Sequence, residues 1–379
     1  MAVFRNIPIP ALRLTPGFVI ADGDLAYLPA SGRIRDELLG RIGRIVLDAF
    51  PDNRHPPHAK LVAVTGPPAQ GVRVAWEDLP DPVRAAIEEI CGSAVVKART
   101  QPGGFSPGVA ARVVCADGTR HFVKAVSREA NPDSPGLHRQ EGDVLAALDP
   151  VIAARRLPIP RLRGTVDRDP WMALVLEDVD GRHPAQPWRP GEIERVLAAL
   201  DQLAEALTPA PIAVPTVGER FAEAFTGWRM LARSPGHDGL DRWTLAHLGE
   251  LAALEATWTA HAAGDTLLHT DVRADNLLLT ADRVVVVDWP QACRGAAFID
   301  PVFLAPSVAM QGGPGLADML ALSRAGRTAD RRDLAATVCA VAGYLTQRSL
   351  EPAPAGLPTV RAFQAAQGAV ARRWLAELL

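Results

Sequence analysis

The chain has 379 residues, of which 48% are hydrophobic and 22% charged, and its net charge is −3 at pH 7. This composition is ordinary for a globular protein and argues against nucleic-acid binding, which usually requires a basic surface. No apolar stretch is long enough to span a bilayer, and the four scattered cysteines indicate neither a metal site nor a disulfide framework. We therefore expect a cytoplasmic protein without nucleic-acid or membrane partners, and its oligomeric state stays open.

The first 75 residues carry the weakest pattern in the chain. Residues 18–27 predict a pair of short strands around a turn at Asp22-Gly23, and residues 34–50 predict a helix. We interpret residues 1–75 as an N-terminal extension or a small appended subdomain, and the pattern does not decide between the two.

Residues 76–179 have the pattern of a strand-rich lobe. The predicted elements, in chain order, are a helix over 81–91, strands over 95–99, 110–115 and 121–126, a helix over 138–148 and a strand over 171–179. Asp81 is the expected N-cap of the first helix and Gly92 its end, while Asp117-Gly118 is a strong hairpin signal. A proline-broken linker precedes the last strand.

Residues 180–379 show mainly the period of helices. Helices are predicted over residues 192–207, 220–231, 243–261, 334–348 and 360–379. Strands followed by helices predict an α+β protein with an N-lobe over 76–179 and a helical C-lobe over 180–379.

The most informative motif lies between the third and fourth of these helices. It has the form His-x-Asp-x-x-x-x-Asn over residues 269–276, and a four-valine strand ending in Asp288 follows it. Phosphoryl transfer from ATP needs a carboxylate that orients the acceptor hydroxyl, together with oxygen ligands that hold Mg²⁺ against the phosphates. We expect Asp271 to orient or deprotonate the hydroxyl, and Asn276 and Asp288 to bind Mg²⁺.

Other residues of the same motif have supporting roles in this interpretation. His269 is expected to support the loop through hydrogen bonds and to transfer no proton. Arg273 is expected to contact the γ-phosphate, where a fixed cation stabilises the charge of the transition state. Asp275 fits equally well as a residue that caps the turn.

A second group of residues in the N-lobe predicts the phosphate side of an ATP site. Gly103, Gly104 and Ser106 belong to a glycine-rich loop whose backbone N–H groups can approach phosphates closely. Lys124, on the next strand, is expected to neutralise the α- and β-phosphates, and Glu141 on the following helix is its expected partner. A plain hairpin turn, an edge lysine and a solvated helix face are the alternative interpretations.

The strand over 171–179 leads from one lobe to the other. There the Glu177 carbonyl and the Val179 N–H are placed to hydrogen-bond the edge of an adenine ring between apolar neighbours. Backbone contacts leave no side-chain signature, so ATP is expected and GTP is not excluded.

These motifs resemble the aminoglycoside phosphotransferase and choline kinase-like family, a branch of the protein-kinase-like fold. The resemblance covers roughly residues 76–379 and includes Asp288-Trp289, where protein kinases carry Asp-Phe-Gly. It implies a bilobal α+β fold and an ATP- and Mg²⁺-dependent kinase that acts on a small-molecule hydroxyl. It also implies that Asp300 is a buried carboxylate that holds the catalytic loop in shape.

The chain departs from the family pattern at two points, which leaves the acceptor open. The loop reads Asp271-Val-Arg-Ala-Asp-Asn276 where Asp-Leu-His-Pro-Gly-Asn is usual, and Pro301 follows Asp300 in place of Leu-Ala. Family acceptors include aminoglycosides, macrolides, choline, sugars and amino alcohols. Residues 300–379 hold eight arginines against six acidic residues, although acidic residues between 180 and 261 can also contribute. We therefore favour a neutral or weakly charged hydroxylated metabolite or natural product over a highly cationic antibiotic.

Two other function classes compete with a small-molecule kinase. A nucleotide-binding pseudokinase that docks a partner through residues 1–75 is disfavoured because every expected catalytic residue is present. A protein kinase is disfavoured because Asp-Phe-Gly and a recognisable activation segment are missing. Four tryptophans of the C-lobe either line the acceptor pocket or pack in the core, and we favour the core; they are Trp188, Trp228, Trp243 and Trp258.

Overall fold

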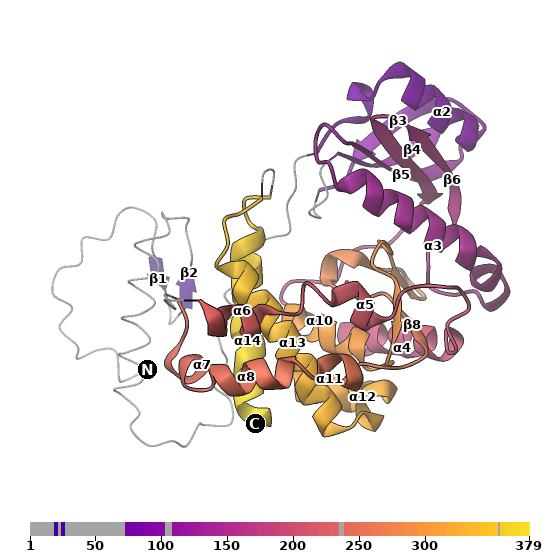
Figure 1. The fold of residues 1–379 in the computed structure, drawn as a ribbon. Helices are drawn as coiled ribbons and strands as arrows, with labels where there is room; N and C mark the ends of the chain where they lie inside the picture. The colour runs from indigo at the N-terminus through magenta and orange to yellow at the C-terminus, as the bar shows by residue number, and fades with distance from the viewer. Residues whose placement is uncertain (1–18, 22–23, 27–72, 103–107, 235–238, 355–356) are drawn as a thin grey trace. The chain divides into compact units, whose positions relative to one another are not determined.

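The structure is a computed structural model that describes residues 19–21, 24–26, 73–102, 108–234, 239–354 and 357–379 (Figure 1). The chain divides into two compact units, Met1–Leu61 and Val62–Leu379. In the first unit, β1 (Val19–Ala21) and β2 (Asp24–Ala26) pair as an antiparallel hairpin, which confirms the predicted strand pair. The helix expected over residues 34–50 lies outside the described residues.

The N-lobe of the second unit contains a five-stranded antiparallel sheet in the order β3-β4-β5-β7-β6. Its strands are β3 (Val95–Thr100), β4 (Val109–Cys115), β5 (Arg120–Ser127), β6 (Leu162–Arg168) and β7 (Trp171–Glu177). All four predicted strands are confirmed. The edge strand β6 was not predicted, and it lies in the segment expected to be a linker. Its sequence shows no apolar alternation, since Val166 is its single buried residue.

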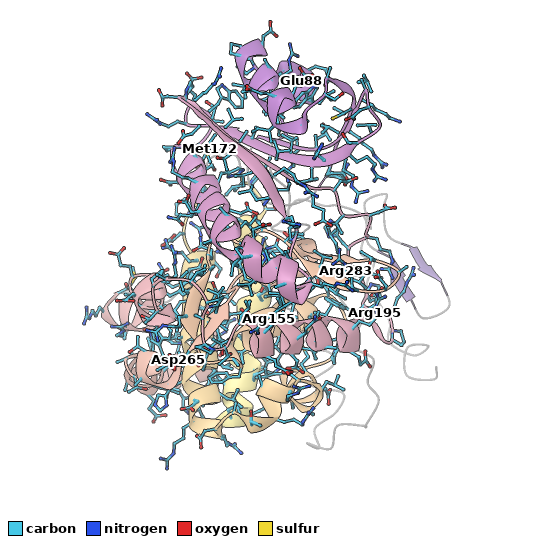
Figure 2. The ribbon with its side chains drawn as sticks, turned by 90° about the vertical axis from the view of Figure 1, so that its right-hand side faces the viewer. Glu88, Arg155, Met172, Arg195, Asp265 and Arg283 are labelled. Atoms are coloured by element: carbon cyan, nitrogen blue, oxygen red, sulfur yellow. The ribbon has the colours of Figure 1, made fainter. Side chains whose placement is uncertain are left out.

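Helices cover both faces of this sheet. The alternation of β7 places Ala173 and Val175 in the cluster that contains Ile87 of α2 (Asp81–Cys91), while Met172 and Leu174 face the cluster of α3 (Ser134–Arg155) (Figures 1 and 2). A short 3-10 helix, η1 (Trp76–Asp78), precedes α2. The helix α3 is longer than predicted at both ends.

The two ends of α2 test the predicted capping residues. Gly92 ends the helix with φ 76°, a left-handed conformation that glycine adopts without a steric penalty, as predicted. The predicted N-cap is wrong by one position, because Pro80 occupies the cap and Asp81 is already the first helical residue.

The C-lobe is mostly helical. Its helices are α4 (Glu192–Ala206), α5 (Val217–Phe221), α6 (Gly227–Arg233), α7 (Arg242–Ala246), α8 (Leu248–Glu255), α9 (Trp258–His261), α10 (Ile299–Met310), α11 (Leu316–Leu322), α12 (Arg324–Thr328), α13 (Arg331–Ser349) and α14 (Val360–Leu378). Helices α4, α13 and α14 confirm their predictions. The single helices predicted over 220–231 and 243–261 are wrong, since each region is broken into shorter helices. None of the described helices is both long and apolar enough to cross a membrane.

Close packing explains one of these breaks. A Cβ atom on Gly227, the first residue of α6, would lie 2.1 Å from the Gly343 carbonyl oxygen of α13, so α6 begins where the two backbones touch. The indole of Trp228 is fully buried beside this contact, and Trp258 is 2% exposed. Trp188 is also buried and Trp243 is half-buried, so the core-packing interpretation of the tryptophans holds for three of the four.

Two small antiparallel strand pairs of the C-lobe hold the predicted motif, and the second of them is a hairpin. Strand β8 (Thr266–Leu268) pairs with β11 (Cys293–Gly295), and β9 (Leu277–Leu279) pairs with β10 (Val284–Val286). Arg195 of α4 fixes the second hairpin, because its guanidinium donates to the carbonyl oxygens of Thr280, at 2.7 Å, and Arg283, at 3.2 Å. Figure 2 shows Arg195 and Arg283 on this part of the C-lobe. The motif therefore lies on a loop that rigid elements support at both ends.

Candidate active site

The loop between β8 and β9 is held by the carboxylate of Asp300. Its oxygens accept hydrogen bonds from the backbone N–H groups of His269, at 2.9 Å, and Thr270, at 2.7 Å. Thr270 has φ 61°, which a β-branched residue rarely adopts, and its hydroxyl donates to the Gln291 carbonyl at 2.7 Å. Asp300 thus occupies the position of the loop-holding carboxylate that the resemblance implied.

The ring of His269 connects this loop to the strand that follows it. It is fully buried, and its Nε2–H donates to the Val287 carbonyl at 2.9 Å. Its Nδ1 accepts from the Asp271 N–H at 3.1 Å, so the ring is neutral with the proton on Nε2. Burial lowers the pKa of His269, which agrees with this state. This geometry is the one expected of a histidine that supports the loop.

The two predicted metal ligands lie next to each other across β9 and β10. The Val287 N–H donates to the Asn276 carbonyl at 3.0 Å, which brings the adjacent Asp288 beside Asn276. The Asn276 amide nitrogen donates to the Asp271 carbonyl at 2.8 Å and to its carboxylate at 3.3 Å. No described residue donates to the Asn276 Oδ1 atom, and this oxygen and the Asp288 carboxylate form a donor set suited to Mg²⁺.

The predicted pair of Lys124 and Glu141 is present and includes a third member. The Lys124 ammonium donates to both Glu141 carboxylate oxygens at 2.8 Å and to Asp288 Oδ1 at 2.8 Å. Glu141 is 1% exposed. Burial alone would raise the pKa of Asp288, but the charge of Lys124 outweighs burial and lowers it to about 2. Asp288 is therefore ionised at neutral pH.

Asp271, the predicted base, lies beside a cation. The Arg273 guanidinium bonds to the Asp271 carboxylate and, through Nε and Nη2, to Asp275 at 3.1 Å. Burial raises the pKa of Asp271 to about 6 although Arg273 opposes the shift. The alternative that Asp275 caps the turn is wrong, because its carboxylate pairs with Arg273 and no side chain caps the short helix η2 (Ala274–Asn276).

A cavity of about 220 Å³ separates the two lobes beside these residues, and we call it the interlobe cavity. The predicted residues that line it are Lys124, Glu177, Val179, Asn276 and Asp288. Its apolar walls come from both lobes and include Val109, Phe122, Leu176, Leu278 and Val287. The Val179 carbonyl accepts from Arg112, whereas no described residue accepts from the Val179 N–H. The cavity therefore has both charged and apolar walls.

The glycine-rich loop is described only in part. Gly103, Gly104 and Ser106 lie outside the described residues. Gly108 has φ 113°, and a Cβ atom there would lie 2.3 Å from the Ala125 carbonyl oxygen, so only glycine fits this position. Gln101 and Pro102, at the other end of the loop, line the interlobe cavity.

A sequence model of the phosphotransferase enzyme family matches residues 104–336, which include Lys124, Glu141, the loop over 269–276 and Asp288. The chain belongs to this family. It is a small-molecule phosphotransferase, as the motifs predicted. No curated protein matches the chain.

Solved structures are similar in fold to this phosphotransferase. A choline/ethanolamine kinase family protein from Mesorhizobium loti has 15% identity and a TM-score of 0.52, covering 79% of this chain and 97% of its own. A thermostable mutant of APH(4)-Ia, in ternary complex with AMP-PNP and hygromycin B, has 15% identity and a TM-score of 0.53, covering 77% and 98%. These likenesses confirm the predicted bilobal α+β fold.

A second cavity of the phosphotransferase, of about 330 Å³, lies among the helices of the C-lobe, and we call it the helical cavity. Asp271 and Arg273 line it, together with side chains from α5, α10, α13 and α14. The loop over 269–276 thus contributes to both cavities, because Asp275 and Asn276 line the interlobe cavity. A group bound in either cavity lies against the same short loop.

Sequence reasoning missed several residues of the interlobe cavity, and His138 and Arg112 are among them. His138 lies one helical turn before Glu141 on α3, and burial lowers its pKa to about 4, so it is neutral. Arg112 of β4 binds the Asp178 carboxylate at 3.1 Å and the Val179 carbonyl, which fixes the segment between the lobes. The spacing of three positions between His138 and Glu141 was a usable signal, since both lie on one helix face.

Proposed function

We propose that this phosphotransferase moves the γ-phosphoryl group of Mg²⁺-bound ATP to a hydroxyl of a small molecule. The observation that carries the proposal is the single loop that presents Asp271 to the helical cavity and Asn276 to the interlobe cavity. Such an arrangement would place an acceptor hydroxyl beside Asp271 and a nucleotide beside Asn276, close enough for the hydroxyl to attack the γ-phosphorus on the side opposite the leaving oxygen.

The interlobe cavity is the proposed nucleotide site. Lys124, held by Glu141, would bind the α- and β-phosphates, and Gly103, Gly104 and Ser106 would approach the phosphates with their backbone N–H groups. The Val179 N–H and the Glu177 carbonyl would bind the purine edge, so GTP is not excluded. The APH(4)-Ia structure, which contains AMP-PNP and hygromycin B, supports a nucleotide and an acceptor bound together.

Asn276 and Asp288 would hold Mg²⁺. Both offer hard oxygen atoms, and the pKa of about 2 keeps the Asp288 carboxylate ionised and ready to bind a cation. When bound, the ion neutralises phosphate charge and so lowers the barrier to transfer. Lys124 pairs with Asp288 in the structure. When a nucleotide is bound, its ammonium group would turn towards the phosphates, which are negatively charged as Asp288 is.

Asp271 would orient the acceptor hydroxyl and take its proton. The acceptor oxygen forms a bond to the γ-phosphorus, the bond between that phosphorus and the β,γ-bridging oxygen breaks, and ADP leaves with the bonding electrons. A pKa of about 6 suits this role, because the carboxylate is ionised at neutral pH yet more basic than an ordinary aspartate. Arg273, already beside Asp271, would stabilise the charge on the transferred group.

The proposal is tested without knowing the acceptor, by transfer to water. We expect slow, Mg²⁺-dependent release of phosphate from ATP, which Asp271→Asn reduces at least about 100-fold while the ATP dissociation constant stays within about threefold. Asp318→Asn, an exposed aspartate at the start of α11, is the matched control and should behave as wild type. Nucleotide binding without any hydrolysis would instead favour the pseudokinase. Unchanged hydrolysis in Asp271→Asn would refute the role of Asp271.

A further inference from the structure

The helical cavity contains an unusual share of the aromatic residues of the chain. The protein has 10 phenylalanines and 2 tyrosines in 379 residues. Four of the phenylalanines and one of the tyrosines line this one cavity, namely Phe221, Phe225, Phe303, Phe363 and Tyr344. They come from α5 and the turn after it, α10, α13 and α14, so the cavity is where aromatic side chains from different parts of the chain converge.

Three of these rings, Phe221, Phe225 and Phe303, pack against one another and form one side of the cavity, which we call the wall. Phe221 stacks on Phe225 with ring centroids 5.0 Å apart and planes 20° apart. Phe303 meets both rings edge-on, at centroid distances of 5.9 and 5.7 Å. Phe225 is 3% exposed and anchors the group in the core, while Phe221 and Phe303 are half-buried. The wall therefore presents flat apolar ring surface to whatever occupies the cavity.

The polar side chains around this wall are mostly uncharged. Gln291, Gln367 and Tyr344 line the cavity, and no described residue hydrogen-bonds their side-chain amide and hydroxyl groups. Gln367 is only 6% exposed as a whole residue. An amide that lines a cavity without a protein partner can hydrogen-bond a ligand there. Amides and a hydroxyl recognise the hydroxyl and carbonyl groups of neutral molecules.

The charge of the cavity disfavours a cationic ligand. Asp271 is the one carboxylate among the described residues that line it, and Arg273 already pairs with Asp271. An ammonium group in this cavity would lose its hydration without gaining an unpaired carboxylate.

We infer that the acceptor of the proposed transfer is an uncharged alcohol that carries a flat apolar ring close to the reacting hydroxyl. The ring would lie on the wall of Phe221 and Phe303, with its polar groups bonded to Gln367, Gln291 or Tyr344, and its hydroxyl at Asp271. This inference rests on the proposed function and adds the acceptor class to it.

A matched pair of probes tests the ring preference directly. Phenyl β-D-glucoside and methyl β-D-glucoside are both neutral and carry the same hydroxyls, but only the first has an aromatic ring. We expect wild-type protein with Mg²⁺ and AMP-PNP to bind the phenyl glucoside about tenfold more tightly, and more tightly than the polycation kanamycin, in ligand-observed NMR titrations. Equal or undetectable binding of the two glucosides, or tighter binding of kanamycin, would overturn the inference.

A conservative variant connects that preference to the wall. Phe221→Leu keeps an apolar side chain but removes the flat ring, so the phenyl preference should fall to about threefold or less. Trp243→Leu is the matched control, since its ring stacks on His247 at 4.6 Å and does not line the cavity. A full preference in Phe221→Leu, or its loss in Trp243→Leu, would refute the assignment of the wall.

The inference and the proposed function fail in different ways. Wild-type ATP hydrolysis with no ring preference overturns the acceptor class alone. A ring preference with no hydrolysis under any condition leaves an aromatic binding site and overturns the phosphotransfer at Asp271.

Discussion

The pKa of Asp271 leads to a quantitative prediction for the pH dependence of activity. Its ordinary value is 3.8, and burial raises it to about 6 in the folded protein. The carboxylate form, which the reaction needs, should then fall from ~90% at pH 7 to ~10% at pH 5, roughly a ninefold loss of rate. An aspartate with the ordinary pKa would remain ~90% ionised at pH 5 and would show almost no loss.

Arg273 provides the perturbation that assigns this titration to Asp271. Its positive charge favours the carboxylate form and so lowers the pKa of Asp271 towards the ordinary value. Arg273→Gln removes that charge and should move the acid limb of the rate profile to higher pH, whatever its effect on the maximum rate. The measurement is kcat/KM for ATP hydrolysis between pH 5 and 8, which reports the pKa values of the free enzyme.

Burial also raises the pKa values of Glu141 and Asp300, so the shift of the acid limb in Arg273→Gln is what assigns that limb to Asp271. Two further buried groups titrate outside the assay range. The pKa of Asp288, about 2, and that of His138, about 4, both lie below the pH range of the assay. An acid limb below pH 5 in the wild type would show that Asp271 is not raised. If the acid limb of Arg273→Gln lay at the same pH as that of the wild type, or at a lower pH, Arg273 would not lower the pKa of Asp271 and the electrostatic reasoning would be refuted.

Two further substitutions test the metal site and the support of the loop. Asp288→Ala removes a hard-oxygen ligand, so Mg²⁺ should no longer strengthen the binding of ADP. Calorimetric titrations of ADP with Mg²⁺ and with EDTA measure this effect. A Mg²⁺ effect that persists in the variant would exclude Asp288 as a ligand. Asp300→Ala leaves the N–H groups of His269 and Thr270 without their acceptor and should lower the free energy of unfolding by ~2–4 kcal/mol. Urea unfolding beside the control Asp318→Ala measures this, and a loss below ~0.5 kcal/mol would contradict it.

Much of the site follows from short-range sequence spacing. The interval between His269 and Asn276 fits one loop, and the valine strand before Asp288 pairs with the strand after Asn276, so local geometry brings these groups together. Lys124 is recognisable because strand alternation aims it towards the C-lobe. A single later helix supplies its partner, Glu141.

The features that sequence reasoning missed depend on distant contacts. The aromatic wall joins α5 to α10, whose residues Phe221 and Phe303 are more than eighty positions apart and carry no shared pattern. Strand β6 has few buried residues, so it pairs with β7 without an apolar alternation that could reveal it. The break before α6 arises where Gly227 meets Gly343 of a much later helix. Arg273 pairs with two carboxylates only because the loop folds back on itself.

The most direct test of the central claim is a search for the phosphorylated product. Wild-type protein and Asp271→Asn would be incubated with Mg²⁺-ATP and a panel of aminoglycosides, macrolides, nucleosides, sugars, amino alcohols and ring-bearing neutral alcohols. Mass spectrometry would detect a product heavier by about 80 Da, the mass added by one phosphoryl group. We predict such a product with the wild type and at least about 100-fold less with Asp271→Asn. Equal product formation by both proteins would contradict the catalytic role of Asp271.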